Sequence, residues 1–77
     1  MLASTPRTFI GSTTFTVAGM TCEHCRRAVT EEIGAVAGVA AVAVDLATGT
    51  VTVTATCPVD RAYIAAAVDE AGYALVP

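Results

Sequence analysis

The chain has 77 residues, which limits it to one domain, because a chain of about 60 to 80 residues buries only about 60% of its unfolded surface and cannot divide that core in two. Seven acidic residues against four arginines give a net charge of −3, which argues against the basic surface of a nucleic-acid binder. With 55% hydrophobic and 14% charged residues the chain is too apolar for disorder, yet no uncharged run supplies the roughly 18–20 apolar residues of a membrane span, so stable membrane insertion is not expected.

The amino-terminal residues set the first predicted boundary. Residues 1–8 are mostly small or polar, which predicts a flexible arm before a domain that covers residues 9–77. Residues 1–7 lack an apolar segment behind a basic start and so do not resemble a secretory signal. The expected location is therefore cytoplasmic.

A two-residue alternation predicts the first strand. Phe15 and Val17 alternate with threonines over residues 13–17, which places both apolar side chains on one face, and the strand can extend back to Phe9. Gly19 is predicted to end it.

A helix is predicted to follow. Thr21 is its expected N-cap, and Glu23 lies in its first turn, where the positive end of the helix dipole favours an acid. Gly34 and Gly38 are predicted to end the helix. Its apolar face repeats every four residues: Cys25, Val29 and Ile33.

Two strands joined by a hairpin come next. Residues 39–45 and 50–56 alternate valine with alanine or threonine, and residues 45–49 form the predicted turn between them. Pro58 is predicted to stop the second of these strands, because proline has no N–H to donate to a ladder.

Asp60 is the expected N-cap of a second helix that ends at Gly72, and residues 73–76 are predicted to form a closing strand. The apolar stripe of this helix comprises Ile64, Ala67, Val68 and Ala71. The resulting order of elements, βαββαβ, is the ferredoxin-like arrangement. The predicted fold class is therefore α+β: a sandwich in which two helices cover one face of a four-stranded antiparallel sheet.

The three cysteines, Cys22, Cys25 and Cys57, are an odd number, which argues against a disulfide framework in a chain without a secretory signal. The predicted chain directions put Cys57 at the opposite end of the domain from the other two. The helix N-terminus beside Cys22 and Cys25 lowers thiol pKa values and so favours the thiolates that bind metals. Two soft thiolates suit a soft ion of low coordination number such as Cu(I), whereas zinc prefers four ligands.

The residues around these thiols form the motif Gly19-Met20-Thr21-Cys22-x-x-Cys25. Together with the junction Val36-x-Gly38-Val39 and the closing Glu70-Ala-Gly-Tyr73, this motif resembles the heavy-metal-associated domain family, over about residues 13–76. The family includes small bacterial copper chaperones. The resemblance implies the ferredoxin-like fold and a cytoplasmic metal carrier that is not an enzyme.

The resemblance also implies the cargo and its route. Cys22 and Cys25 would hold Cu(I), with Ag(I) as a mimic, through two thiolates on an exposed loop. The ion would pass by ligand exchange to a copper acceptor such as the metal-binding domain of a copper-transporting P-type ATPase.

Four neighbouring residues are accessory candidates. The resemblance implies that Met20 is a buried anchor of the loop and that Tyr73 shields the site. Thr21 is expected to help stabilise the thiolates. His24 is expected either to be solvated and tune the site or to serve as a third ligand in a metal-bridged homodimer.

Two alternative functions are also compatible with the motif. The chain can be the N-terminal metal-binding module of a copper-transporting ATPase, and a Cys-x-x-Cys pair is also found in thiol–disulfide oxidoreductases. A structural zinc site would need Cys57, which the topology places at the wrong end. Arg26 and Arg27 are candidate contacts for an acidic partner.

Overall fold

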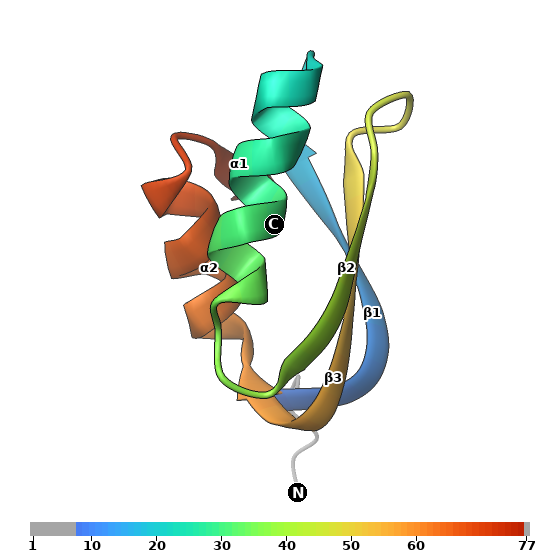
Figure 1. Cartoon of the computed structure of the whole chain (residues 1–77), viewed down its shortest axis with the longest axis vertical. Coiled ribbons are helices and arrows are strands. Elements are labelled where there is room, and N and C mark those ends of the chain that lie inside the picture. Colours follow the sequence, from blue (N-terminus) through green and yellow to red (C-terminus); the bar gives the residue numbers. More distant parts are fainter. Residues whose placement is uncertain (1–7, 77) are drawn as a thin grey trace, which may run out of the picture.

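Six elements follow one another in the described part of the chain, residues 8–76 of a computed structural model (Figure 1). They are β1 (Thr8–Ala18), α1 (Glu23–Gly34), β2 (Val39–Asp45), β3 (Thr50–Asp60), α2 (Arg61–Glu70) and β4 (Ala74–Val76). The strands form one antiparallel sheet in the order β2-β3-β1-β4, and both helices lie on the same side of it. The predicted ferredoxin-like α+β fold is confirmed.

The core lies between the helix layer and the sheet. Each layer supplies side chains with no exposed surface, and burying one such valine or isoleucine contributes about 1.5–3 kcal/mol. These side chains are Val29 and Ile33 of α1, Val51 and Val53 of β3, and Ile64 and Val68 of α2. The apolar faces predicted for both helices therefore point inward.

The first strand is longer than its predicted centre. β1 begins at Thr8 and includes Phe9, whose ring contacts that of Phe15 edge to face at a centroid distance of 5.5 Å. Of the arm expected over residues 1–8, residues 1–7 lie outside the described residues. Arg61 at the start of α2 stacks over both rings, which ties α2 to the far end of the sheet.

Pro58 does not end β3, contrary to the prediction. The register between β1 and β3 shifts, so that Phe9 pairs with Val59 while Gly11 pairs with Ala55. Between these two pairs β3 has three residues, 56–58, where β1 has only Ile10, so β3 forms a bulge. A proline is tolerated in such a bulge, because the regular ladder is interrupted and needs no N–H from it.

Both ends of α2 are capped by the residues that the sequence indicates. The Asp60 carboxylate accepts a hydrogen bond of 2.9 Å from the Ala62 N–H. At the other end, the Gly72 N–H bonds to the Asp69 carbonyl and the Tyr73 N–H to the Val68 carbonyl. This is a Schellman motif, and it needs Gly72 because φ there is 95°. Tyr73 thus completes the helix end, and β4 starts one residue later than predicted.

Candidate metal centre

The loop between β1 and α1 lies at the end of the sheet where the β2–β3 hairpin turns, since the Val17 N–H bonds to the Gly49 carbonyl. Gly19 starts the loop with φ of 92°, and a Cβ built there would lie 3.3 Å from the Tyr73 ring. Met20 is buried and belongs to the core cluster. The loop is therefore held from below by Met20 and bounded on one side by Tyr73.

The Cys22 and Cys25 thiols meet on this loop. Their Sγ atoms are 3.3 Å apart, well beyond the roughly 2.05 Å of a disulfide, and both cysteines are free. Their environments differ, because Cys25 is only 6% exposed whereas Cys22 is exposed. One thiol is thus fixed by the core and the other is open to solvent.

Cys22, and not Thr21, is the N-cap of α1. The Cys22 carbonyl accepts the first helical hydrogen bond, from the Arg26 N–H at 3.1 Å, and the backbone of Cys22 is extended. No side chain caps the helix at this position. The helix therefore starts one residue later than predicted, which places Cys22 at its edge and Cys25 in its first turn.

Tyr73 contacts the buried thiol directly. Its hydroxyl donates a hydrogen bond of 2.8 Å to the Sγ atom of Cys25. This bond is the largest contribution that lowers the Cys25 pKa from 9.0 to about 6, followed by backbone hydrogen bonding from Thr21 and by the contact with Cys22. The same bond raises the pKa of Tyr73. Thr21 thus acts on the thiolate through its backbone, not as a helix cap.

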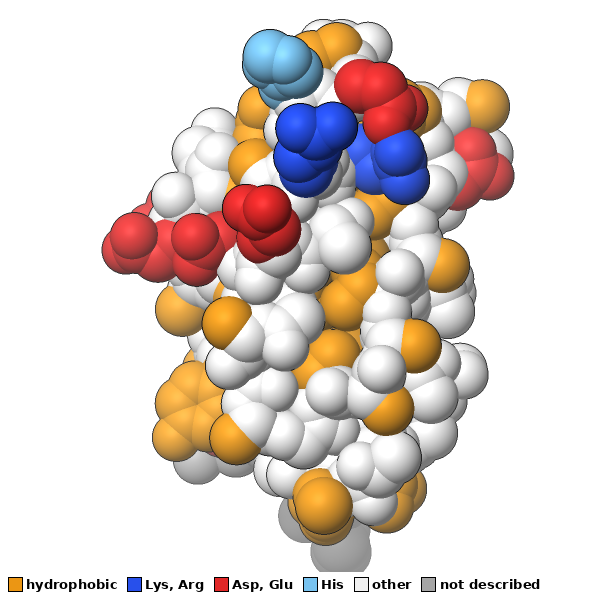
Figure 2. Space-filling view, in the orientation of Figure 1, with side chains coloured by type: hydrophobic (Ala, Val, Ile, Leu, Met, Phe, Trp, Pro, Cys, Tyr) orange, Lys and Arg blue, Asp and Glu red, His pale blue; other side chains and the backbone are white. Residues whose placement is uncertain are grey.

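Charged side chains surround the loop on its helix side. On the face that Figure 2 shows, the pale blue and blue side chains in view gather at the upper end of the molecule, beside acidic ones. Arg26 forms an ion pair with Glu23, and both are exposed, so the pair contributes little to stability. His24 and Arg27 line a shallow hollow that reaches Tyr73.

Cys57 lies in β3 at the opposite end of the sheet, near Gly38, as the predicted chain directions require. It is exposed. In residues 8–76, no three His, Cys, Asp or Glu side chains come together as a potential metal site. The thiol pair therefore has no preformed third and fourth ligand in this part of the chain.

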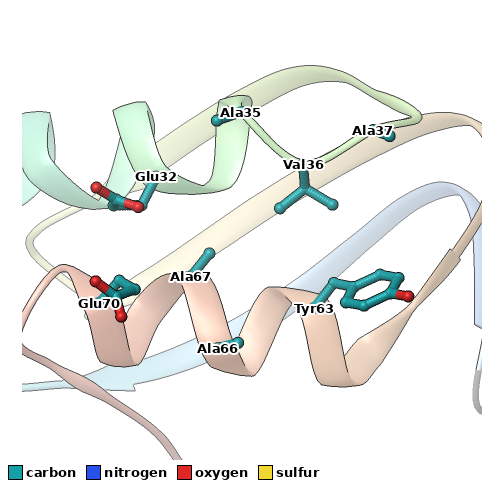
Figure 3. A pocket seen from close by; sticks show the side chains of 8 residues that line it. All are labelled: Glu32, Ala35, Val36, Ala37, Tyr63, Ala66, Ala67 and Glu70. Atoms are coloured by element: carbon teal, nitrogen blue, oxygen red, sulfur yellow. The ribbon is translucent and has the colours of Figure 1, made fainter.

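A second hollow lies between the two helices (Figure 3). Small apolar side chains and the Tyr63 ring line most of it, with Glu32 and Glu70 at one end. It contains no thiol or imidazole. Its side chains offer no ligand set for a soft metal.

Neither described helix, of 12 and 10 residues, is long enough to cross a membrane.

Residues 14–74 match the family model described as heavy-metal-associated domain. Among solved structures, "CopZ metallochaperone" is 30% identical with a TM-score of 0.81, over 86% of this chain and 100% of that one. The N-terminal domain of a potential copper-translocating P-type ATPase from Bacillus subtilis, in the Cu(I)-loaded state, is 31% identical with a TM-score of 0.77, over 87% and 85%. A chain described as "Crosstalk between Cu(I) and Zn(II) homeostasis" is 25% identical with a TM-score of 0.79, over 84% and 94%. No curated protein sequence matches.

Proposed function

The chain belongs to the heavy-metal-associated domain family, which is not enzymatic, and from this premise we propose that it is a cytoplasmic Cu(I) chaperone. Cys22 and Cys25 would hold one ion between their thiolates. The partner would be a copper acceptor such as the metal-binding domain of a copper-transporting P-type ATPase.

The thiol pair is the observation that carries this proposal. Two Sγ atoms 3.3 Å apart, on a loop that closes no disulfide, can turn toward one ion with small side-chain rotations. Their unequal exposure suits a carrier. Cys22 can meet an incoming thiolate or ion first, while Cys25 stays fixed by the core.

The charge state of Cys25 also favours binding. With a pKa of about 6, the Cys25 thiol is mostly ionised at pH 7. An arriving metal ion therefore seldom has to displace a proton from this sulfur. Tyr73 supplies the strongest of the hydrogen bonds that maintain this state. The thiolate is the form that binds soft metals.

Copper is favoured over zinc by the number of ligands. A stable zinc site takes four ligands, and residues 8–76 place no third His, Cys, Asp or Glu with the thiol pair. A soft ion that accepts two thiolates, Cu(I) or its mimic Ag(I), fits this donor set. The chain is also similar to one whose description names both Cu(I) and Zn(II). Zinc is therefore the competing cargo to be tested.

Delivery would proceed by exchange of ligands. A thiolate of the acceptor would attack the ion from the exposed side and displace Cys22, after which a second acceptor thiolate would displace Cys25. Each step breaks one metal–sulfur bond and forms another, so no oxidation or net proton transfer is needed when the incoming sulfur is already a thiolate. The exposed position of Cys22 supports this order.

The second candidate is the N-terminal metal-binding module of a copper-transporting ATPase, favoured by the likeness to the Bacillus subtilis domain. The same thiol pair would then receive copper instead of delivering it. Transfer from the copper-loaded chain to a separately purified acceptor domain, followed by NMR of both, measures the direction and equilibrium of exchange.

The deciding experiment is anaerobic titration of the reduced chain with Cu(I), and separately with Zn(II), against a competing chelator. Cys22→Ser and Cys25→Ser are each expected to abolish tight Cu(I) binding, whereas Cys57→Ser serves as the matched control and is expected to bind like the unaltered chain. Tight binding that survives the loss of both thiols would refute the site. Tighter binding of zinc than of copper would refute the cargo.

A further inference from the structure

The two edges of the sheet differ in how they are protected. Proteins protect edge strands by making them short, or by placing charges or prolines on them, because unpaired backbone groups can pair with another chain. β4 forms one edge and has only three residues. β2 forms the other edge with seven residues, Val-Ala-Ala-Val-Ala-Val-Asp, whose only charge is at the end, on Asp45.

The backbone groups at the free edge of β2 can be assigned from the ladder. The Gly49 carbonyl bonds to β1, and the Thr56 N–H bonds to the Gly38 carbonyl beside β2. Because successive residues of an antiparallel strand bond to opposite neighbours, the β3 residues 50, 52 and 54 face β2. Their partners in β2 are Asp45, Ala43 and Ala41. Val42 and Val44 therefore direct their N–H and C=O groups away from the sheet.

We propose that this edge is an interface for a second copy of the chain. β2 would pair antiparallel with β2 of the second copy, with Ala43 opposite Ala43 on the two-fold axis. Val42 of each copy then lies opposite Val44 of the other, and their outward backbone groups form four hydrogen bonds. The two four-stranded sheets join into one continuous sheet.

The side chains on β2 fit this pairing. Val42 and Val44 are half-buried on the helix side of the sheet, so each copy adds apolar contacts to the other beneath the new strand pair. Ala43 is exposed on the open face and is too small to obstruct its equivalent across the axis.

The distribution of charge argues for a second copy as the occupant. Each copy carries a net charge of −3, so two copies can approach only where like charges do not meet. Figure 2 shows charged side chains confined to the upper part of this face, with uncharged surface below. In the proposed register Asp45 lies opposite Ala41, and the two Asp45 side chains are four residues apart along the strands. That separation is about 13 Å, beyond a screening length of about 8 Å.

The pairing leaves both thiol sites accessible. β2 ends at the hairpin, which lies at the same end as the Cys22 and Cys25 loop. Antiparallel pairing therefore puts the two loops at opposite ends of the dimer. Such a dimer needs no metal and differs from a metal-bridged dimer, in which the two loops would meet.

The association is expected to be weak. One strand pair contributes less than the roughly 800 Å² per partner of a standard stable interface. We therefore expect a dissociation constant of about 0.1–1 mM. Dimers would then form where the local concentration of the chain is high.

Sedimentation equilibrium of the reduced, copper-free Cys57→Ser chain, from about 20 μM to about 2 mM, tests the proposal without interference from disulfides. The weight-average mass is expected to rise from 7.8 kDa toward twice that value. Ala43→Lys puts two ammonium groups opposite each other and is expected to weaken association at least about tenfold. Ala66→Lys adds the same charge in the hollow between the helices and is the matched control.

Amide hydrogen exchange over the same concentrations identifies the surface. The Val42 and Val44 amides are expected to become slower as concentration rises. Val44→Pro removes one outward N–H without removing a bond to β3 and should also abolish association; if it does not fold, as judged by circular dichroism, Ala43→Lys decides the matter. A mass of 7.8 kDa at every concentration, or association lost in Ala66→Lys but kept in Ala43→Lys, would overturn the proposal.

Discussion

The Tyr73 hydroxyl donates a 2.8 Å hydrogen bond to the Sγ atom of Cys25, 48 residues away along the chain. This contact joins the end of α2 to the start of α1, and the Schellman motif of α2 sets the position of the ring. The charge of the candidate metal site therefore depends on a helix end that contributes no metal ligand.

Without the Tyr73 hydroxyl, the Cys25 thiolate should take up a proton more readily. In Tyr73→Phe we expect the Cys25 pKa to rise above its value of about 6, because the largest contribution to its lowering is lost. At pH 7 a smaller fraction of the thiol is then ionised, and the apparent Cu(I) affinity falls with it. The Cβ chemical shift of Cys25, followed by NMR against pH, measures the pKa; an unchanged midpoint would remove Tyr73 from this role.

Stability should depend on pH through the same thiol. The pKa of Cys25 is about 6 in the folded chain, compared with the ordinary 9.0 of an exposed thiol in the unfolded chain. Ionisation of this thiol therefore favours the folded state. This contribution is complete above about pH 9 and is lost as the pH falls through about 6. We expect the free energy of unfolding of the reduced, metal-free chain to rise with pH across this window.

Urea denaturation at several pH values between 6 and 9 measures this slope, in a range where Tyr73 remains protonated. Cys25→Ser is the control, and it should remove most of the rise. A slope of the same size in both proteins would assign the pH dependence to other groups.

Gly72 should be needed for both stability and the site. Gly72→Ala forces a Cβ into a backbone with φ of 95°, which costs about 1–2 kcal/mol, and any relaxation of the turn moves Tyr73 away from Cys25. Gly34→Ala is the matched control. No atom lies within 4 Å of a Cβ built there, and the residue is helical, so a gain of about 0.4–1 kcal/mol is expected.

Thermal and urea denaturation give both values for the glycine variants, and the Cβ shift of Cys25 gives the effect on the thiol. Equal effects of the two substitutions would show that the left-handed turn at Gly72 is not required.

His24 should affect assembly more than binding. Its side chain is exposed beside the thiol loop, so His24→Ala is expected to leave 1:1 Cu(I) binding within about two-fold and to weaken copper-driven dimers. Arg27→Ala, from the same hollow, is the control. Light scattering of copper-loaded samples measures the dimer, and an undiminished dimer in His24→Ala would exclude a bridging imidazole.

The sequence alone determined the order of the elements and the place of the thiol pair. Alternation in the strands, four-residue spacing of Cys25, Val29 and Ile33, and the Asp60 and Gly72 caps are local signals, because each depends on residues within one or two turns. The Cys22-x-x-Cys25 spacing is local in the same way. For that reason the fold class and the candidate ligands could be predicted before any contact was known.

Only the tertiary structure decided how these parts act on one another. Pro58 remains within β3 because the partner strand shifts register there, and Cys22 replaces Thr21 as the cap because its carbonyl receives the first helical bond. The Tyr73 bond that lowers the Cys25 pKa joins residues far apart in the chain. Such relationships depend on the packing of whole elements, and no pattern of neighbouring residues encodes their distances.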